Sequence, residues 1–187
     1  LWKNGRSAFF DDTDPLGMSP LMKQYLAGLL SHSAEITYFL APYINSYKRF
    51  ARGTFAPTRI IWSVDNRTAG YRVCGDGTAG VRVECRIGGS DMNPYLAMAA
   101  QLAAGLSGIE AAMTLPEAAK GDVYKGRTAM LPTTLRDARA ALLKSKMLRT
   151  AFGADVVQHY ARAAEWEIEE FDRIVTDYEV ARGFERA

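Results

Sequence analysis

The order of strand-like and helix-like segments is the feature that most constrains the fold of this chain. Three short runs rich in β-branched and apolar residues, 58–64, 69–75 and 80–87, follow one another with few residues between them. Connections this short are typical of an antiparallel meander. Beyond residue 93 the apolar residues recur at helical spacing. We therefore expect an α+β fold, in which an antiparallel β-sheet has helices packed on one side.

Capping residues and apolar periodicity place the other elements. Helices are expected at 20–31, 94–113, 135–148 and 154–178, and a further short strand at 8–10. No regular element is assigned to the mixed apolar run 34–40. Residues 45–57 carry little periodicity, which predicts a loop long enough to be functional.

Composition narrows the class of protein. The chain has 187 residues, of which 48% are hydrophobic, as in an ordinary globular core. Its formal net charge of only +2 argues against a general nucleic-acid binder. It has no apolar run of the roughly 20 residues that a membrane span needs. Its two cysteines and two histidines form no zinc-binding pattern, which favours a reducing, cytoplasmic location.

The small net charge hides an uneven distribution. Residues 45–86 hold eight basic residues, seven of them arginine, against three acidic ones, so that this window carries +5 and the rest of the chain −3. Arginine is suited to bidentate binding of carboxylates and phosphates. This window is therefore the candidate anion-binding region.

The strand-like run 81–87 lies within this window and alternates cleanly. Arg82, Glu84 and Arg86 share one face, and the apolar residues between them share the other. One interpretation is a solvated outer face whose charges pair at little energetic gain. In the other, Glu84 neutralises the arginines or holds a divalent metal beside phosphate oxygens.

Two other patterns have simpler explanations. The segment 75–80 reads GxGxxG, but a strand-like run follows it, where a dinucleotide-binding loop requires a helix, so we predict a hairpin loop. His32 and His159 lack ligand-spaced neighbours and are expected to be ordinary surface or core residues.

Four ordered motifs resemble the successive signatures of the glutamine synthetase family. They are Asn45-Ser46-Tyr47-Lys48-Arg49, Asp65-Asn66-Arg67-Thr68, Arg82-Val83-Glu84-Cys85-Arg86 and Asn93-Pro94-Tyr95-Leu96. Leu1-Trp2 resembles the stretch just after the family's MHxHxSLW segment. The resemblance therefore covers nearly the whole chain. It implies that residues 1–187 are the carboxy-terminal portion of the catalytic domain, without the amino-terminal domain and the first half of the catalytic domain.

The resemblance implies an ATP-dependent ligase that phosphorylates the glutamate side-chain carboxylate and transfers the acyl group to ammonia or an amine. Arg49 and Arg86 would hold the glutamate carboxylates, and Arg67 would also take part in substrate binding. The implied catalytic residues are Arg67 and Arg72, which would steady the ATP phosphates during transfer. Arg82 would lie on the nucleotide side, and Glu84 would bind Mg²⁺ or Mn²⁺.

One departure from the family pattern concerns the amine. Ammonia-using members generally read Gly-Tyr-Glu-Ala-Pro in the loop, whereas this chain reads Gly53-Thr54-Phe55-Ala56-Pro57. Phe55 cannot accept a proton, but it could pack against an apolar amine. A γ-glutamyl-polyamine or other γ-glutamyl-amine ligase is therefore the alternative to glutamine synthesis.

The family's other metal-binding glutamates would precede Leu1, and its active sites form between subunits of stacked rings. The resemblance therefore implies a homo-oligomer for the full-length protein and an inactive isolated fragment. A non-catalytic relative or fragment, acting as a binding or assembly module, is the remaining alternative.

Overall fold

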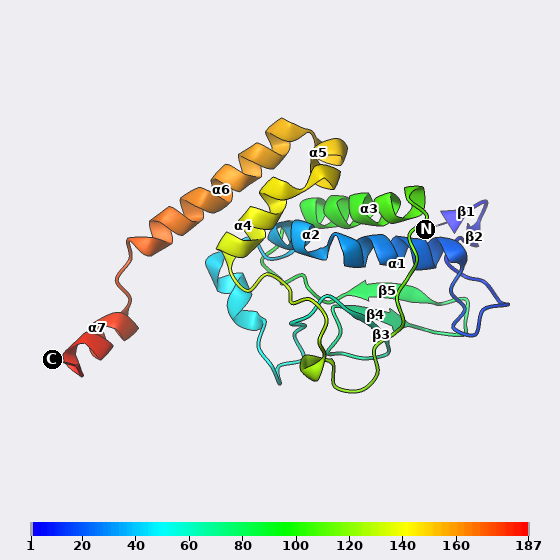
Figure 1. Cartoon of the computed structure of the whole chain (residues 1–187), viewed down its shortest axis with the longest axis horizontal. Helices are drawn as coiled ribbons and strands as arrows, with labels where there is room; N and C mark the ends of the chain where they lie inside the picture. Colours follow the sequence, from blue (N-terminus) through cyan, green and yellow to red (C-terminus); the bar gives the residue numbers. More distant parts are fainter. Residues whose placement is uncertain (1, 187) are drawn as a thin grey trace.

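The computed structural model describes residues 2–186 and is a mixed arrangement of helices and short strands (Figure 1). The strands are β1 (Trp2–Lys3), β2 (Arg6–Ser7), β3 (Trp62–Val64), β4 (Tyr71–Cys74) and β5 (Arg82–Cys85). The α-helices are α1 (Pro20–Ser31), α2 (Ser33–Leu40), α3 (Pro94–Glu110), α4 (Leu135–Lys144), α5 (Lys146–Phe152), α6 (Ala154–Asp172) and α7 (Asp177–Phe184). Two 3₁₀ helices are η1 (Ile44–Arg49) and η2 (Val123–Lys125). None of the described helices is long and apolar enough to cross a membrane.

The central sheet has the order β3-β4-β5, and its topology corrects one prediction. β4 and β5 are antiparallel as expected, but β3 and β4 are parallel, so the three strands are not an antiparallel meander. Parallel pairing over a short connection is possible because β3 has only three residues, about 10 Å of chain. The segment 65–70 is long enough to return to the start of the neighbouring strand.

The helices lie on one side of this sheet, as predicted, with α1, α2 and α3 above the strands in Figure 1. Tyr71 of β4 is fully buried beneath them. Its hydroxyl lies 3.3 Å from the Leu29 carbonyl oxygen of α1 and accepts from Ser33 Oγ at 3.1 Å. The core thus joins the sheet directly to the α1–α2 pair.

Helices α1 and α3 cross at very close range. A Cβ atom added at Gly28 would lie 2.2 Å from the Ala104 carbonyl oxygen, and one at Gly108 would lie 2.3 Å from the Gln24 carbonyl oxygen. The two backbones can approach this closely only because neither glycine carries a side chain.

The carboxy-terminal helices are more broken than the periodicity predicted. The helix expected through residue 148 is interrupted at Ser145, whose hydroxyl accepts from the Leu148 amide at 3.0 Å and starts α5. The expected run 154–178 is interrupted after Asp172, and Thr176 caps α7 together with Glu179. In both places a side chain that can cap a new helix competes with continuation of the old one.

Three other expectations also need correction. Residues 33–40 form helix α2, and the first part of the expected loop 45–57 lies in η1. The strand expected at 8–10 is reduced to a single bridge between Phe10 and Met18, while β1 and β2 form the nearby hairpin. The GxGxxG segment is confirmed as the turn between β4 and β5.

His32 is a structural residue, as expected, and connects three helices. Its Nδ1 lies 3.0 Å from Glu35 Oε1, and its Nε2 lies 3.2 Å from Ser107 Oγ of α3. The other Glu35 oxygen accepts from the Ser145 hydroxyl at the start of α5. This network ties the α1–α2 junction to α3 and α5.

This network predicts acid-sensitive stability. Burial raises the pKa of Glu35, but the hydrogen bonds to His32 and Ser145 outweigh burial and lower the pKa below its usual value. A carboxylate whose pKa is lower in the folded than in the unfolded protein stabilises the fold fully at pH values above the unfolded-state pKa. This stabilisation is lost as the pH falls through the folded-state pKa. In urea titrations, Glu35→Gln is expected to cost about 1 kcal/mol at pH 7. The gap to the native protein should close as the pH falls below the usual glutamate pKa of 4.5, and a gap independent of pH would contradict this prediction.

Candidate functional site

The centre of the site is Glu84 on β5, which lies directly opposite Arg72 on β4. Arg72 Nη1 donates to Glu84 Oε2 at 3.1 Å, and Arg86 Nη1 donates to Glu84 Oε1 at 2.8 Å. The side chains of Arg72 and Arg86 are only 20% and 19% exposed, respectively. This face of the sheet is therefore an ordered cluster of paired charges that is partly shielded from solvent.

Each of the two arginines is also fixed by a second partner. Arg72 pairs with Asp65, and the guanidinium lowers the pKa of that carboxyl. Arg86 Nε donates to the Arg67 carbonyl oxygen at 2.9 Å, and its Nη2 donates to the Phe55 carbonyl oxygen at 3.4 Å. The pairing of β4 with β5 thus places both guanidinium groups, and two loops are attached to them.

A cleft of about 640 Å³ opens beside this cluster. Arg67, Arg72 and Lys120 line it together with a single acidic residue, Asp65. Arg67 is exposed, and its guanidinium makes no hydrogen bond with any described residue. Lys120 is also exposed and makes no hydrogen bond or ion pair with a described residue, so the cleft presents an excess of positive charge with two cations available to an anion.

Phe55 also lines the cleft and is 61% exposed. It has a φ of 58°, a left-handed conformation that is uncommon for a bulky residue. The Phe55 ring therefore lies beside the charged groups, and because it is mostly exposed it contributes little to the hydrophobic core.

Arg49 and Arg82 occupy the edges of the cluster. Arg49 ends η1, and its guanidinium donates to the carbonyl oxygens of Arg86, at 3.4 Å, and Ile87. Arg82 is exposed at the other end of β5, where its Nη1 donates to the Gly80 carbonyl oxygen at 3.3 Å. Of the predicted residues, the structure brings Arg67, Arg72, Glu84 and Arg86 together, with Arg49 next to Arg86.

The described residues do not form a divalent-metal site by themselves. Both Glu84 oxygens accept hydrogen bonds from arginine, and no group of three or more His, Cys, Asp or Glu residues in the described chain could hold a metal ion. Mg²⁺ and Mn²⁺ require several oxygen ligands. Glu84 could therefore supply only one ligand of such a site.

This chain is similar to known proteins along most of its length. Residues 1–183 match the family described as the glutamine synthetase catalytic domain. The chain belongs to the glutamine synthetase family. The family assignment made from the four motifs is therefore confirmed, and the mixed α and β architecture agrees with it.

Two relatives and one solved structure illustrate the range of the family. The γ-glutamylethanolamide synthetase GlnA4 of Streptomyces coelicolor is 48% identical over 91% of this chain and 37% of its own length. Type-1 glutamine synthetase 2 of Dictyostelium discoideum is 38% identical over 98% of this chain and 36% of its own length. A structure of GmaS in complex with ADP superimposes with a TM-score of 0.86 at 29% identity, over 98% of this chain and 44% of that one. This chain therefore spans little more than a third of the length of the two curated relatives.

Residues 118–121 form one wall of the cleft and lie outside the four family motifs. Residues 118–121 line the cleft because they are hydrogen-bonded along β3 and the loop after it. Ser63 Oγ donates to the Ala119 carbonyl oxygen at 2.6 Å, and Asn66 Nδ2 donates to the Gly121 carbonyl oxygen at 2.8 Å. The segment has no helical or strand periodicity, and its only signal was a lysine next to a glycine.

Proposed function

We propose that this chain is the carboxy-terminal portion of the catalytic domain of an ATP-dependent γ-glutamyl ligase. The reaction joins a glutamate side-chain carboxylate to an amine through an acyl phosphate. The observation that carries the proposal is the convergence of Arg72 and Arg86 on Glu84 beside a positively charged cleft that Arg67 also lines. Transfer of a phosphoryl group needs fixed cations around the charge that develops on it.

The proposed roles follow from the position of each guanidinium. Arg67 and Arg72 line the cleft and would steady the phosphates of ATP. Arg49 and Arg86, which lie next to each other, would bind the carboxylates of glutamate, with Arg67 close by. Arg82 would lie on the nucleotide side, at the far end of β5.

Glu84 would contribute one carboxylate ligand to Mg²⁺ or Mn²⁺, with the remaining ligands coming from outside residues 2–186. An anion in the cleft would compete with Glu84 for the two arginines. Such competition would free the Glu84 oxygens that the arginines occupy here.

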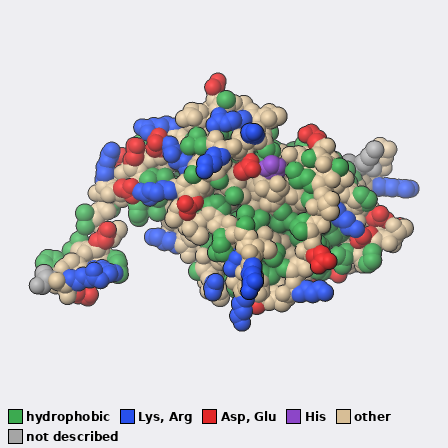
Figure 2. Space-filling view, in the orientation of Figure 1, with side chains coloured by type: hydrophobic (Ala, Val, Ile, Leu, Met, Phe, Trp, Pro, Cys, Tyr) green, Lys and Arg blue, Asp and Glu red, His purple; other side chains and the backbone are tan. Residues whose placement is uncertain are grey.

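The resemblance also implies a homo-oligomer, and we propose one for the complete protein. Helix α7 stands clear of the body of the chain and carries exposed hydrophobic side chains (Figure 2). Tyr178 and Phe184 are 68% and 82% exposed, and Ile174 before the helix is 61% exposed. Apolar surface of this kind is typical of a subunit contact. Sedimentation of the complete protein measures its subunit number.

Phe55 bears on the choice between ammonia and a larger amine. An apolar ring beside the cleft favours an acceptor with an alkyl part, because burying alkyl surface against the ring stabilises the complex. It offers no carboxylate for deprotonating ammonium. The proposed reaction is therefore γ-glutamyl-amine formation, with glutamine synthesis as the second candidate because a relative of similar coverage is a glutamine synthetase.

An acceptor panel tests this choice. ATP hydrolysis by the complete protein should be stimulated at least about tenfold more, in kcat/KM, by an alkylamine, ethanolamine or a polyamine than by ammonia. Phe55→Glu should shift the preference towards ammonia, and Phe55→Leu, which keeps an apolar side chain, should not. A clear preference of the native protein for ammonia would refute the argument from Phe55. Failure of every acceptor, together with no calorimetric binding of an ATP analogue or glutamate, would point to a non-catalytic relative.

A further inference from the structure

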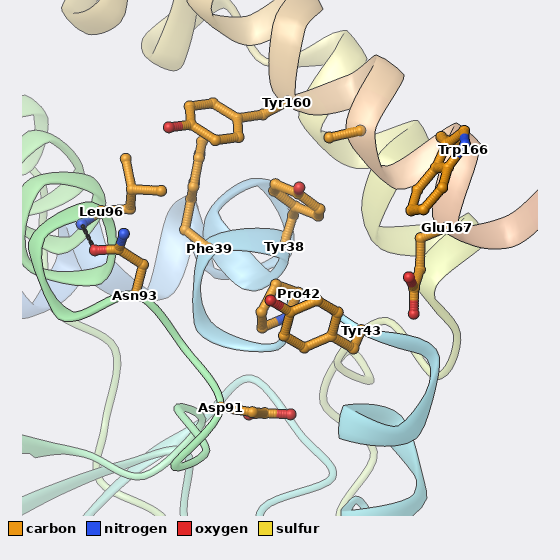
Figure 3. Close-up of a pocket in the computed structure, with 11 residues that line it drawn as sticks. Tyr38, Phe39, Pro42, Tyr43, Asp91, Asn93, Leu96, Tyr160, Trp166 and Glu167 are labelled. Carbon is orange, nitrogen blue, oxygen red and sulfur yellow. Dashed lines mark hydrogen bonds between the residues drawn. The ribbon is translucent and has the colours of Figure 1, made fainter.

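A second cavity lies between α2, the start of α3 and α6 (Figure 3). Its volume is about 340 Å³, and it shares no lining residue with the arginine cleft. We propose that this cavity binds a small organic cation, an ammonium group that carries apolar substituents.

The walls of the cavity are mainly aromatic. The five rings belong to Tyr38, Phe39, Tyr43, Tyr160 and Trp166. Phe39 and Tyr160 pack edge to face with ring centroids 5.4 Å apart, and the Tyr38 and Tyr160 centroids lie 6.2 Å apart. This contact fixes the inner rings. Ring faces attract cations because the π-electrons make them electronegative.

The outer rings are unusually accessible. Tyr43 is 49% exposed and Trp166 is 58% exposed. In Figure 3, Trp166 projects from α6 and Tyr43 lies across the gap below it. A bound cation could therefore contact both rings without displacing core side chains.

The electrostatics of the cavity select a cation over a neutral ligand. Asp91 and Glu167 line it, and none of the other lining residues is basic. Glu167 makes no hydrogen bond or ion pair within residues 2–186. Asp91 Oδ2 accepts from Ser46 Oγ at 2.6 Å, and Asp91 also attracts the guanidinium of Arg49 electrostatically. Glu167 therefore leaves an uncompensated negative charge beside the aromatic rings.

The size of the cavity limits the ligand. Pockets for small molecules range from about 300 to 1,000 Å³, so this one is at the lower end. It suits a compact ammonium ion such as choline. Choline has no N–H bond, so its nitrogen cannot become an amide. Its binding therefore reports on this cavity independently of the proposed ligase reaction.

A comparison of choline with its uncharged carbon isostere, 3,3-dimethyl-1-butanol, tests the proposal on the complete protein. Calorimetry and ligand-detected NMR should show choline binding at least about tenfold more tightly than the isostere. Equal affinities for choline and the isostere would overturn the proposal. So would the absence of choline binding at concentrations up to about 50 mM.

Two variants assign the binding to this cavity. Glu167→Gln keeps the shape of the side chain and should weaken choline binding about tenfold, and Trp166→Leu should weaken it similarly. Glu169→Gln, on the same helix but outside the cavity, removes the same charge and should leave choline affinity unchanged. Equal effects of Glu167→Gln and Glu169→Gln would refute the assignment. Binding that survives in a ligase-inactive Glu84→Ala variant would separate this site from the proposed active site.

Discussion

Replacing Glu84 by alanine in the complete protein is expected to lower kcat for ATP-dependent acyl-phosphate formation by about 100-fold or more. Glu84 is the group on which Arg72 and Arg86 converge, and in the proposed reaction it is the only metal ligand supplied by the cluster. Its removal leaves the cations in the cleft without the carboxylate that orients them. The loss should appear in phosphate release and in trapping of the acyl phosphate with hydroxylamine.

The fold of this variant should persist. The Glu84 side chain is 39% exposed, and ion pairs with this degree of solvent contact contribute about 1 kcal/mol or less. Arg72 also retains Asp65, and Arg86 retains the Arg67 carbonyl oxygen. Glu169→Ala, which breaks a comparable exposed pair with Arg162, is the matched control and should leave activity unchanged. Normal turnover in Glu84→Ala would remove Glu84 from the proposed site.

The largest effect on stability is expected from Gly108→Ala. On helix propensity alone this substitution should stabilise α3 by about 1 kcal/mol. At Gly108, however, the new Cβ would lie 2.3 Å from the Gln24 carbonyl oxygen and 2.6 Å from Gly28 Cα, both of them backbone atoms. Helices α1 and α3 would have to move apart in the core, at an expected cost of about 3 kcal/mol. Urea unfolding measures the change in the free energy of unfolding.

Gly183→Ala is the control for this prediction. Gly183 also lies in a helix, α7, but a Cβ there would meet no atom within 4 Å. Only the propensity effect remains, so this variant should be neutral or slightly stabilising. Gly108→Ala should therefore destabilise the protein, whereas Gly183→Ala should not. A stabilising Gly108→Ala would mean that the α1–α3 crossing is looser than the structure shows.

The candidate site could be predicted from sequence because its residues are concentrated in short motifs. The alternation of Arg82, Glu84 and Arg86 on one strand places them on one face whatever the strand is paired with. The strand directions and helix boundaries were harder to predict. Whether β3 runs parallel or antiparallel to β4 depends on the path of the loop between them, which local propensity does not specify.

The positions at which helices are interrupted are also poorly specified by local sequence. Ser145 lies within a periodic run, and nothing local reveals that its hydroxyl will both cap α5 and donate to Glu35 of a distant helix. At Thr176 the capping signal was present in the sequence, as a threonine followed by a glutamate three residues later. In that case the apolar periodicity of the surrounding residues concealed the signal.

Residue types and their spacing are local properties, and from them the family could be identified and an arginine-rich candidate site predicted. Only the tertiary structure decided that Glu84 accepts from two arginines at once and that residues 118–121 form a wall of the cleft. It alone also brought Trp166 and Glu167 close to Tyr43. These contacts join segments far apart in the chain, and their geometry follows from strand pairing and helix packing, which no short stretch of sequence encodes.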